Sequence, residues 1–209
     1  MYRKAHVRAI RAYPVKPGHN FVMHTSPHSH EDVIAASRHW LEKAVIGLNL
    51  CPFAKSVYIK NQVRFVVSSA DSTDALQADL AAELLKLKET DAAEVDTVLL
   101  IHPCVLNDFL DFNDFLDIVE MTVEALGLEG DFQVASFHPG YQFADAEPDD
   151  ISNYTNRAPY PTLHLLREAS IGRAVEAFPD AADIFERNIE TMRRLGKAGW
   201  ETLFEDEIG

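Results

Sequence analysis

Residues 137–171 read FHPGYQFADAEPDDISNYTNRAPYPTLHLLREASI, and the arrangement of the rest of the chain follows from this stretch. It begins as the end of an apolar strand and ends in a segment expected to open a helix. Between these ends lie four prolines and no regular hydrophobic periodicity. Long irregular connections inside a domain are usually either functional or disordered. Because aromatic residues are rare in disordered segments, we predict an ordered loop that builds a functional site.

The composition limits the class of protein. With 209 residues, 47% of them hydrophobic, the chain can form one globular domain with a buried core. A net charge of −14 disfavours nucleic acid as a partner, because phosphates require a basic surface. Two cysteines favour a reducing compartment over a disulfide scaffold. No apolar run reaches the ~20 residues of a membrane span and no secretory signal is recognisable, so we expect a cytoplasmic protein without membrane contact.

The start of the chain differs from the rest. Residues 1–30 contain five basic residues and no acidic residue, and they end in the histidine-rich run HTSPHSH. We expect residues 1–28 to be a disordered extension, with Met23 as an alternative start. A single domain is predicted at 29–200, followed by an acidic tail at 201–209.

Helices and strands alternate through the middle of the chain. Ser29 to Asp32 has the form of a capping box, and the helix that it opens should end before Pro52. The expected strands are QVRFVVSS at 62–69, VDTVLLI at 95–101 and DFQVASF at 131–137, with an amphipathic helix between each pair. After the long loop we predict two C-terminal helices, at 161–178 and 181–198.

Strands separated by helices of this length usually pair in parallel. We therefore predict an α/β fold, with a small, mainly parallel sheet of about three strands and helices on its faces. Two of the strands are followed by the same dipeptide, His102-Pro103 and His138-Pro139. In a parallel sheet both histidines emerge at the carboxyl edge, where open α/β sheets bind ligands. The long loop leaves from that edge, so we place the functional site there.

The candidate catalytic residues are Cys51, His138 and His164. A cysteine can act as a nucleophile when a base and positive charge lie near it, and histidine transfers protons near neutral pH. Each residue also has a structural interpretation, as a buried thiol or as a histidine bonded to the backbone. A metal site is an alternative. Its ligands for zinc or iron would come from His102, His138, His164 and Glu168.

In the predicted helix, His164 and Glu168 lie four residues apart and would share one face, where they could hold a metal or simply bond to each other. Cys104 is a weaker candidate ligand. The chain contains neither the zinc-protease motif nor a phosphate-binding glycine loop. No nucleotide cofactor is therefore expected.

Arg157 and Arg167 are notable in so acidic a chain, because a guanidinium group binds carboxylates and phosphates through two parallel hydrogen bonds. Asn153, Asn156 and Tyr141 would complete a binding site for a small anionic molecule. In the alternative interpretation, Arg157 holds the loop together through the loop's own acidic residues.

Five segments carry a family resemblance: GLNLCPFAK at 47–55, LLIHP at 99–103, FLDFNDFLDI at 109–118, ASFHPGYQFAD at 135–145 and SNYTNRAPYPTLHLLREASI at 152–171. They resemble the bacterial family catalogued as domain of unknown function 1415, over roughly residues 31–200. The resemblance implies no mechanism. It does imply a shared residue pattern, which is Cys51, Pro52, His138, Tyr141, Asn153, Asn156, Arg157, His164, Arg167 and Glu168. Such a pattern is more typical of an active site than of a packing core.

Three functions remain open on the sequence alone. The first is an enzyme, a hydrolase or transferase, that acts on a small anion at a Cys/His/Arg site formed by the strand ends and the loop 138–168. The second is a metal-dependent hydrolase or oxygenase with histidine ligands. The third is a non-catalytic module that binds a metabolite or a protein partner. The shared site depends on parallel strands, since one antiparallel strand could send the two His-Pro ends to opposite edges.

Overall fold

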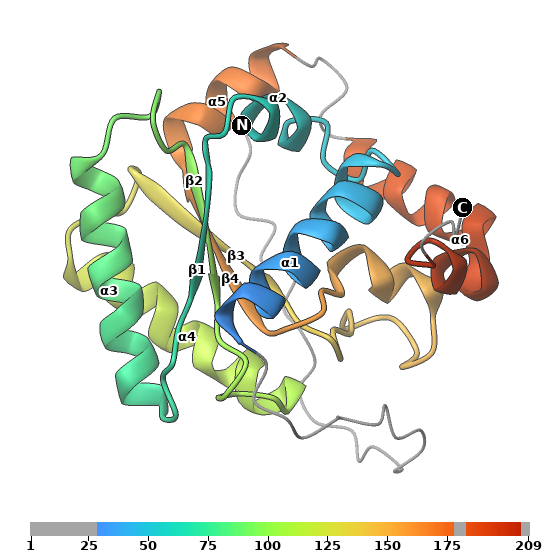
Figure 1. Ribbon diagram of the computed structural model, residues 1–209, viewed down its shortest axis with the longest axis horizontal. Coiled ribbons are helices and arrows are strands. Elements are labelled where there is room, and N and C mark those ends of the chain that lie inside the picture. The colour runs from blue at the N-terminus through green and yellow to red at the C-terminus, as the bar shows by residue number, and fades with distance from the viewer. Residues whose placement is uncertain (1–28, 178–182, 206–209) are drawn as a thin grey trace.

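A computed structural model describes residues 29–177 and 183–205 of the chain (Figure 1). The predicted extension at 1–28, with Met23 in it, lies outside these residues. The elements in chain order are α1 (His30–Trp40), η1 (Leu41–Ile46), α2 (Ala54–Ile59), β1 (Val63–Val67), α3 (Thr73–Glu89), β2 (Thr97–Ile101), α4 (Phe109–Ala125), β3 (Phe132–Phe137), η2 (Ile151–Asn156), β4 (Thr162–Arg167), α5 (Glu168–Ala177) and α6 (Ile184–Thr202).

The four strands form one mixed sheet in the order β1-β2-β4-β3. Strands β1 and β2 are parallel, with Val63 opposite Thr97. Strand β4 is antiparallel to both of its neighbours, β2 and β3. Strands β2 and β3 therefore point the same way, although they are not adjacent. The predicted α/β class and the two C-terminal helices are confirmed, whereas the prediction of three mainly parallel strands is wrong.

The fourth strand is the main correction. TLHLLR was predicted as the start of a helix, but Thr162–Arg167 is β4, and helix α5 begins only at Glu168. Leucine favours helices in isolation, but pairing with a strand on either side outweighs that weak preference. Because side chains alternate along a strand, Leu163 and Leu165 enter the core on one face, while His164 points to the opposite face.

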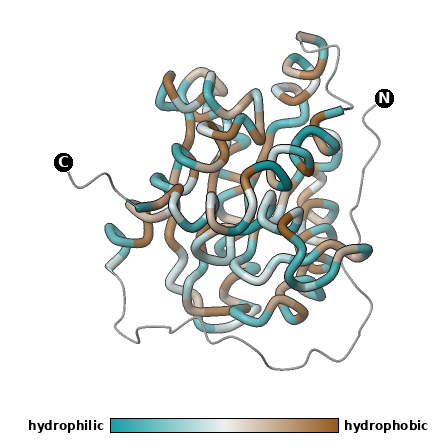
Figure 2. Tube along the Cα trace, turned by 90° about the vertical axis from the view of Figure 1, so that its right-hand side faces the viewer, coloured by the Kyte–Doolittle hydropathy of each residue, from teal (hydrophilic) through white to brown (hydrophobic). Residues whose placement is uncertain are grey.

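Helices cover both faces of the sheet (Figure 1). Helices α3 and α4 bury one face, with the leucine stripe of α3 and Phe112 of α4 fully inaccessible. Helix α1 and η1 cover part of the other face, where Trp40 and Ala44 pack with Leu99 and Ile101. In Figure 2 the helical turns change between hydrophobic and hydrophilic residues, as expected for helices that bury one side.

The two ends of the described fold are both anchored. Ser29 and Asp32 form the predicted capping box at the start of α1, each bonding the backbone N–H of the other. Helix α6 continues to Thr202, and Leu203 and Phe204 pack against the α1 side of the core. The first residues of the predicted tail at 201–209 therefore belong to the packed fold. Residues 206–209 lie outside the described part of the chain. No helix in the described ranges is long and apolar enough to cross a membrane.

Candidate functional site

The loop after β3 is ordered, and it is held by hydrogen bonds within itself. Arg157 donates from Nε to the carbonyl oxygen of Tyr141 at 3.2 Å and from Nη2 to that of Pro148 at 2.9 Å. Its guanidinium lies 4.2 Å from the centre of the Tyr154 ring. Arg157 therefore holds the loop together, and its hydrogen-bond partners are backbone carbonyls where acidic side chains were expected.

The other loop residues predicted to bind the ligand also have structural partners. The Asn153 side chain, which is 0% exposed, accepts from Phe143 N at 3.0 Å and donates to Glu147 O at 2.8 Å. Asn156 accepts from the Thr155 hydroxyl. Tyr141 packs between Phe109 and Phe143, and burial raises its pKa to about 12. These contacts hold the loop together.

We expect Asn153→Ala to lower the free energy of unfolding by about 2 kcal/mol, because it leaves the buried N–H of Phe143 without a partner and removes one of the two hydrogen bonds to the carbonyl of Glu147. Urea denaturation monitored by circular dichroism measures this change. The control is Asn113→Ala on α4, which should change stability by less than about 0.5 kcal/mol. Equal effects for the two variants would contradict the role assigned to Asn153.

His102 and His138 do emerge at the same edge of the sheet, since β2 and β3 point the same way. Both rings stack on Phe112, with centroid distances of 5.6 Å and 5.1 Å. His138 donates from Nε2 to Leu106 O and accepts from Gly140 N at Nδ1, so both of its nitrogens are used. His102 donates from Nδ1 to Val105 O. Burial lowers the pKa of each to about 4, so both rings are neutral at pH 7.

The predicted metal ligands do not come together. His102 and His138 lie on the α4 side of the sheet, while His164 is on the opposite face because it belongs to a strand. Glu168 is exposed in the first turn of α5. Within residues 29–177 and 183–205, no group of three or more histidine, cysteine, aspartate or glutamate side chains is arranged to hold a metal ion.

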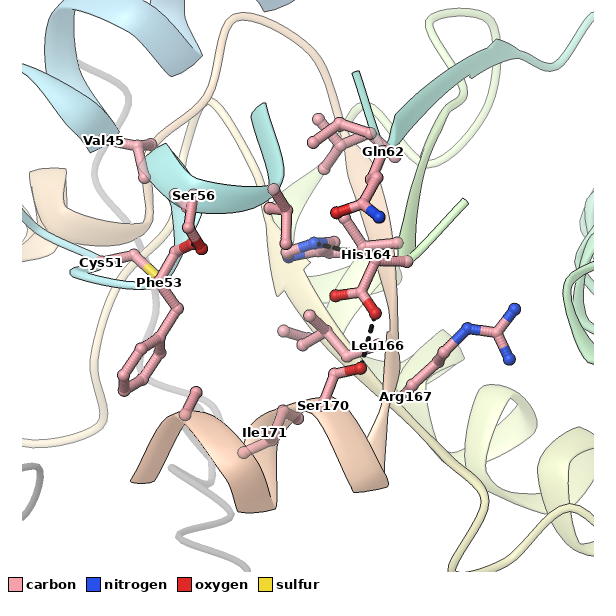
Figure 3. A pocket seen from close by; sticks show the side chains of 18 of the residues that line it. Val45, Cys51, Phe53, Ser56, Gln62, His164, Leu166, Arg167, Ser170 and Ile171 are labelled. Atoms are coloured by element: carbon pink, nitrogen blue, oxygen red, sulfur yellow. Dashed lines mark hydrogen bonds between the residues drawn. The ribbon is translucent and has the colours of Figure 1, made fainter. Parts of the chain in front are cut away.

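A cavity of about 650 Å³ lies on the face of the sheet opposite α3 and α4. Figure 3 shows Cys51 and Phe53 on one side of it, His164 on the other, and Ile171 of α5 below. Most of its lining is apolar and comes from α1, η1, α2, α5 and the sheet. Two of the three predicted catalytic residues, Cys51 and His164, therefore face one cavity, although it lies over a face of the sheet and not at the strand ends.

The hydrogen bonds of His164 define its protonation. Its Nε2 lies 2.7 Å from the Thr97 hydroxyl, which itself donates to the carbonyl oxygen of Leu165 at 2.7 Å. Because that hydroxyl has one hydrogen, it must accept from His164, so the proton of the neutral ring is on Nε2. Nδ1 then carries a lone pair that has no partner among the described residues. Burial lowers the pKa of His164 to about 4, so the ring is neutral at pH 7.

The thiol of Cys51 is also uncharged at neutral pH. Burial raises its pKa, and hydrogen bonds from the backbone of Phe53 and Ala54 offset this only in part. A nucleophilic thiolate requires the opposite shift. The Cys51 and His164 side chains are thus a neutral thiol and a neutral imidazole, without the charge separation of an activated cysteine–histidine pair.

Arg167 bonds to backbone carbonyl groups. Its Nη2 donates to the carbonyl oxygens of Leu87 and Thr90, each at 2.6 Å, and its Nε to that of Val95 at 3.3 Å. Figure 3 shows the guanidinium turned away from the cavity. Arg167 therefore closes the C-terminal end of α3 and joins it to the segment before β2.

Several polar residues of the cavity were not expected from the sequence. Ser170 donates to Asp96 Oδ1 at 2.5 Å, and Arg173 donates to the Ser170 hydroxyl at 2.8 Å. Gln62 lines the same side, and Lys60 lies exposed at the rim. These residues flank strands or lie on α5 and carry no shared motif, so only the packing of α5 against the sheet brings them together.

Comparison with known proteins gives one match. The sequence model of a family described as "Protein of unknown function (DUF1415)" matches residues 32–202, a range that includes all four strands and the whole cavity lining. No curated protein and no solved structure matches the chain.

Proposed function

The chain belongs to the DUF1415 family, whose function is unknown, and we propose that it is an enzyme acting on a small organic anion held in the cavity between Cys51 and His164. The proposal rests on the free Nδ1 of His164 within a largely apolar cavity of about 650 Å³. Cavities of this size, with a few convergent polar groups, are typical of small-molecule sites.

The charges at the rim support an anionic ligand. Lys60 and Arg173 are exposed where the cavity meets solvent, in a chain whose net charge is −14. Asp96 is the one carboxylate in the described lining, and it accepts a hydrogen bond from Ser170. A carboxylate or phosphate group at the rim would meet Lys60 or Arg173, while an apolar body would fill the space beside Phe53 and Ile171.

We propose that His164 is the catalytic base. The hydrogen bond to the buried Thr97 fixes the ring with its protonated Nε2 on the Thr97 hydroxyl, which leaves the Nδ1 lone pair for the ligand. Because the ring is neutral at pH 7, Nδ1 is able to accept a proton from the bound ligand. Cys51 would contact the ligand as a neutral thiol.

A second candidate function is binding without turnover. It is favoured by the same pKa shifts, because burial lowers the pKa of His164 to about 4 and raises that of Cys51. Without bound ligand, neither residue is then an activated acid or nucleophile at pH 7. The two candidate functions predict different effects of removing the Nδ1 lone pair of His164. An enzyme should lose turnover, whereas a binding module has no turnover to lose.

The test is a comparison of the wild type with His164→Gln, whose amide can keep the bond to Thr97 but offers no basic nitrogen. A panel of small carboxylates and phosphates with apolar bodies is screened by ligand-observed NMR, and products are sought by mass spectrometry. We expect a converted ligand in the wild type, and a loss of turnover of at least about 100-fold in His164→Gln with its affinity kept within about threefold. His138→Gln is the matched control on the other face of the sheet, and it should retain turnover.

Each other result has a defined meaning. Binding in the wild type without any conversion supports the binding module and overturns the enzyme. Equal turnover in wild type and His164→Gln overturns the role of His164. If no member of the panel binds the wild type, the cavity is not a site for small organic anions.

A further inference from the structure

One side of the cavity, which we call the polar wall, consists of Gln62, Asp96, Thr97, His164 and Ser170. Among the described residues, this wall offers only hydrogen-bond acceptors to a ligand. We propose that the ligand carries a hydrogen-bond donor, a hydroxyl or an ammonium group, that faces the polar wall. The inference names the substrate class of the proposed anion site and rests on that proposed function.

The side-chain amide of Gln62 shows the pattern most clearly. Its Nε2 donates to the carbonyl oxygens of Ala92 at 3.2 Å and Ala93 at 2.9 Å, which uses both of its hydrogens. This assignment leaves Oε1 as the free atom of the amide. Figure 3 shows that oxygen on the side of the amide nearer His164. Gln62 therefore presents an acceptor to the cavity.

The two hydroxyl groups of the polar wall already use their only hydrogen in a hydrogen bond within the protein. Thr97 donates to Leu165 O at 2.7 Å, and Ser170 donates to Asp96 Oδ1 at 2.5 Å. The second carboxylate oxygen, Asp96 Oδ2, has no hydrogen bond to any described residue. Neither hydroxyl can donate to a ligand without losing a bond that the fold already makes.

His164 completes the set. Its Nε2 hydrogen is used by Thr97, so Nδ1 can only accept. Three unpartnered acceptors thus belong to one wall: Oε1 of Gln62, Oδ2 of Asp96 and Nδ1 of His164. A carboxylate placed there would meet acceptors without donors, which is costly in a partly buried site, whereas a hydroxyl or ammonium group would satisfy them.

The donors not used within the polar wall are exposed on Lys60, Gln133 and Arg173, and Arg173 adjoins the wall through its bond to the Ser170 hydroxyl. This arrangement orients the ligand, with its donor against the polar wall and its anionic group beside Arg173 at the rim. The apolar lining between them, which includes Phe53, suits a hydrocarbon body. The class that combines these features is a hydroxy acid or amino acid with an apolar side chain.

Three probes with one carbon skeleton test this inference by isothermal titration calorimetry: phenylpropionate, phenyllactate and phenylalanine. They differ only by having no donor, a hydroxyl or an ammonium group. We expect phenyllactate or phenylalanine to bind the wild type at least about tenfold more tightly than phenylpropionate. The stronger of the two identifies which donor the wall selects. The methyl ester of phenyllactate is included, and it should bind at least about tenfold more weakly than the acid.

Two variants locate the effect. Asp96→Asn can keep the bond from Ser170 while placing an N–H₂ donor where Oδ2 was, so the preference for a donor-bearing ligand should fall to about threefold or less. Glu94→Gln is the matched control, because it removes one nearby exposed carboxylate outside the cavity and should keep the preference. Thermal unfolding of each variant confirms that it is folded.

The outcomes separate the inference from the proposed function. Equal affinity for phenylpropionate and both donor-bearing acids overturns the inference but leaves the anion site standing. A donor preference together with equal affinity for the ester and the acid supports the inference and overturns the anion site. No binding of any probe at millimolar concentration overturns both, and an unchanged preference in Asp96→Asn overturns the role of the polar wall.

Discussion

The free energy of unfolding should fall steeply between pH 6.5 and pH 4, because His102 and His138 are buried as neutral imidazoles whose pKa values are lowered to about 4. The ordinary value is 6.5, so between these two pH values the unfolded chain binds more protons than the folded one. The stability contributed by the neutral rings is therefore fully present above pH 6.5 and is lost as the pH falls toward 4.

The expected size of this effect is large. The two rings are 0% and 2% exposed, so the difference between 6.5 and 4 corresponds to about 3 kcal/mol for each. The two contributions together are about 6 kcal/mol. The whole free energy of unfolding of a domain is roughly 5–15 kcal/mol, so this loss is comparable with the lower end of that range. Protonation of His138 would also break the hydrogen bond that Nδ1 accepts from Gly140 N. Cooperative unfolding in mild acid is the expected result.

Urea denaturation at a series of pH values from about 7.5 to 4.5 measures this dependence. His102→Phe keeps the stacking on Phe112 but removes one titrating ring, so its slope should be smaller by up to about 1.4 kcal/mol per pH unit. The control is Leu84→Ala, a fully buried residue of α3, which should lower stability at every pH without changing the slope. A wild-type curve that is flat between pH 6.5 and 4.5 would contradict the assignment of buried neutral histidines.

Arg167→Met should lower the free energy of unfolding by about 3 kcal/mol. The guanidinium of Arg167 donates to the carbonyl oxygens of Leu87, Thr90 and Val95, and it lies 5.5 Å from the centre of the Phe132 ring. Hydrogen bonds from a charged donor contribute about 1.5–3 kcal/mol each, and a cation at a helix C-terminus adds to this. Methionine keeps the apolar stem but removes the guanidinium donor from the three carbonyls, although Leu87 O keeps its bond from Thr90 N.

Two further variants test the reason for this effect. Arg167→Lys keeps the charge but not the forked geometry, so it should recover less than half of the lost stability. Arg173→Gln removes an exposed arginine at the cavity rim and should cost less than about 0.5 kcal/mol. If Arg167→Met instead leaves stability unchanged and weakens binding of an anionic ligand tenfold or more, the original expectation of an anion clamp is restored.

The elements that depend on local patterns were predictable. The capping box at Ser29 and Asp32, the leucine stripe of α3 and the three β-branched strands all follow from side-chain chemistry within a few residues. The His-Pro pair also indicated correctly that β2 and β3 end at one edge. Strand β4 was not predictable in this way, because six residues with three leucines fit a helix and a strand equally well.

Because residues 162–167 were predicted as helix and not as strand β4, the predicted neighbours of His164 were also wrong. As a helical residue, His164 was paired with Glu168, but as a strand residue it faces Cys51 across a cavity. The side chains of Arg157, Arg167 and Asn153, which were predicted to bind a ligand, make hydrogen bonds to backbone groups. Polar residues at irregular segments must satisfy nearby backbone groups, and such roles resemble a binding site when only residue types are known.

The sequence by itself determined the class of the fold, most of its helices and strands, the family, and the identity of Cys51 and His164 as residues of interest. Only the tertiary structure decided that these two share a cavity, that both are uncharged, and that Gln62 and Asp96 lie on the same wall as His164. The physical reason is that local periodicity depends on neighbouring residues, whereas burial and hydrogen-bond partners depend on segments far apart in the chain. The insertion of β4 between β2 and β3 brings those segments together.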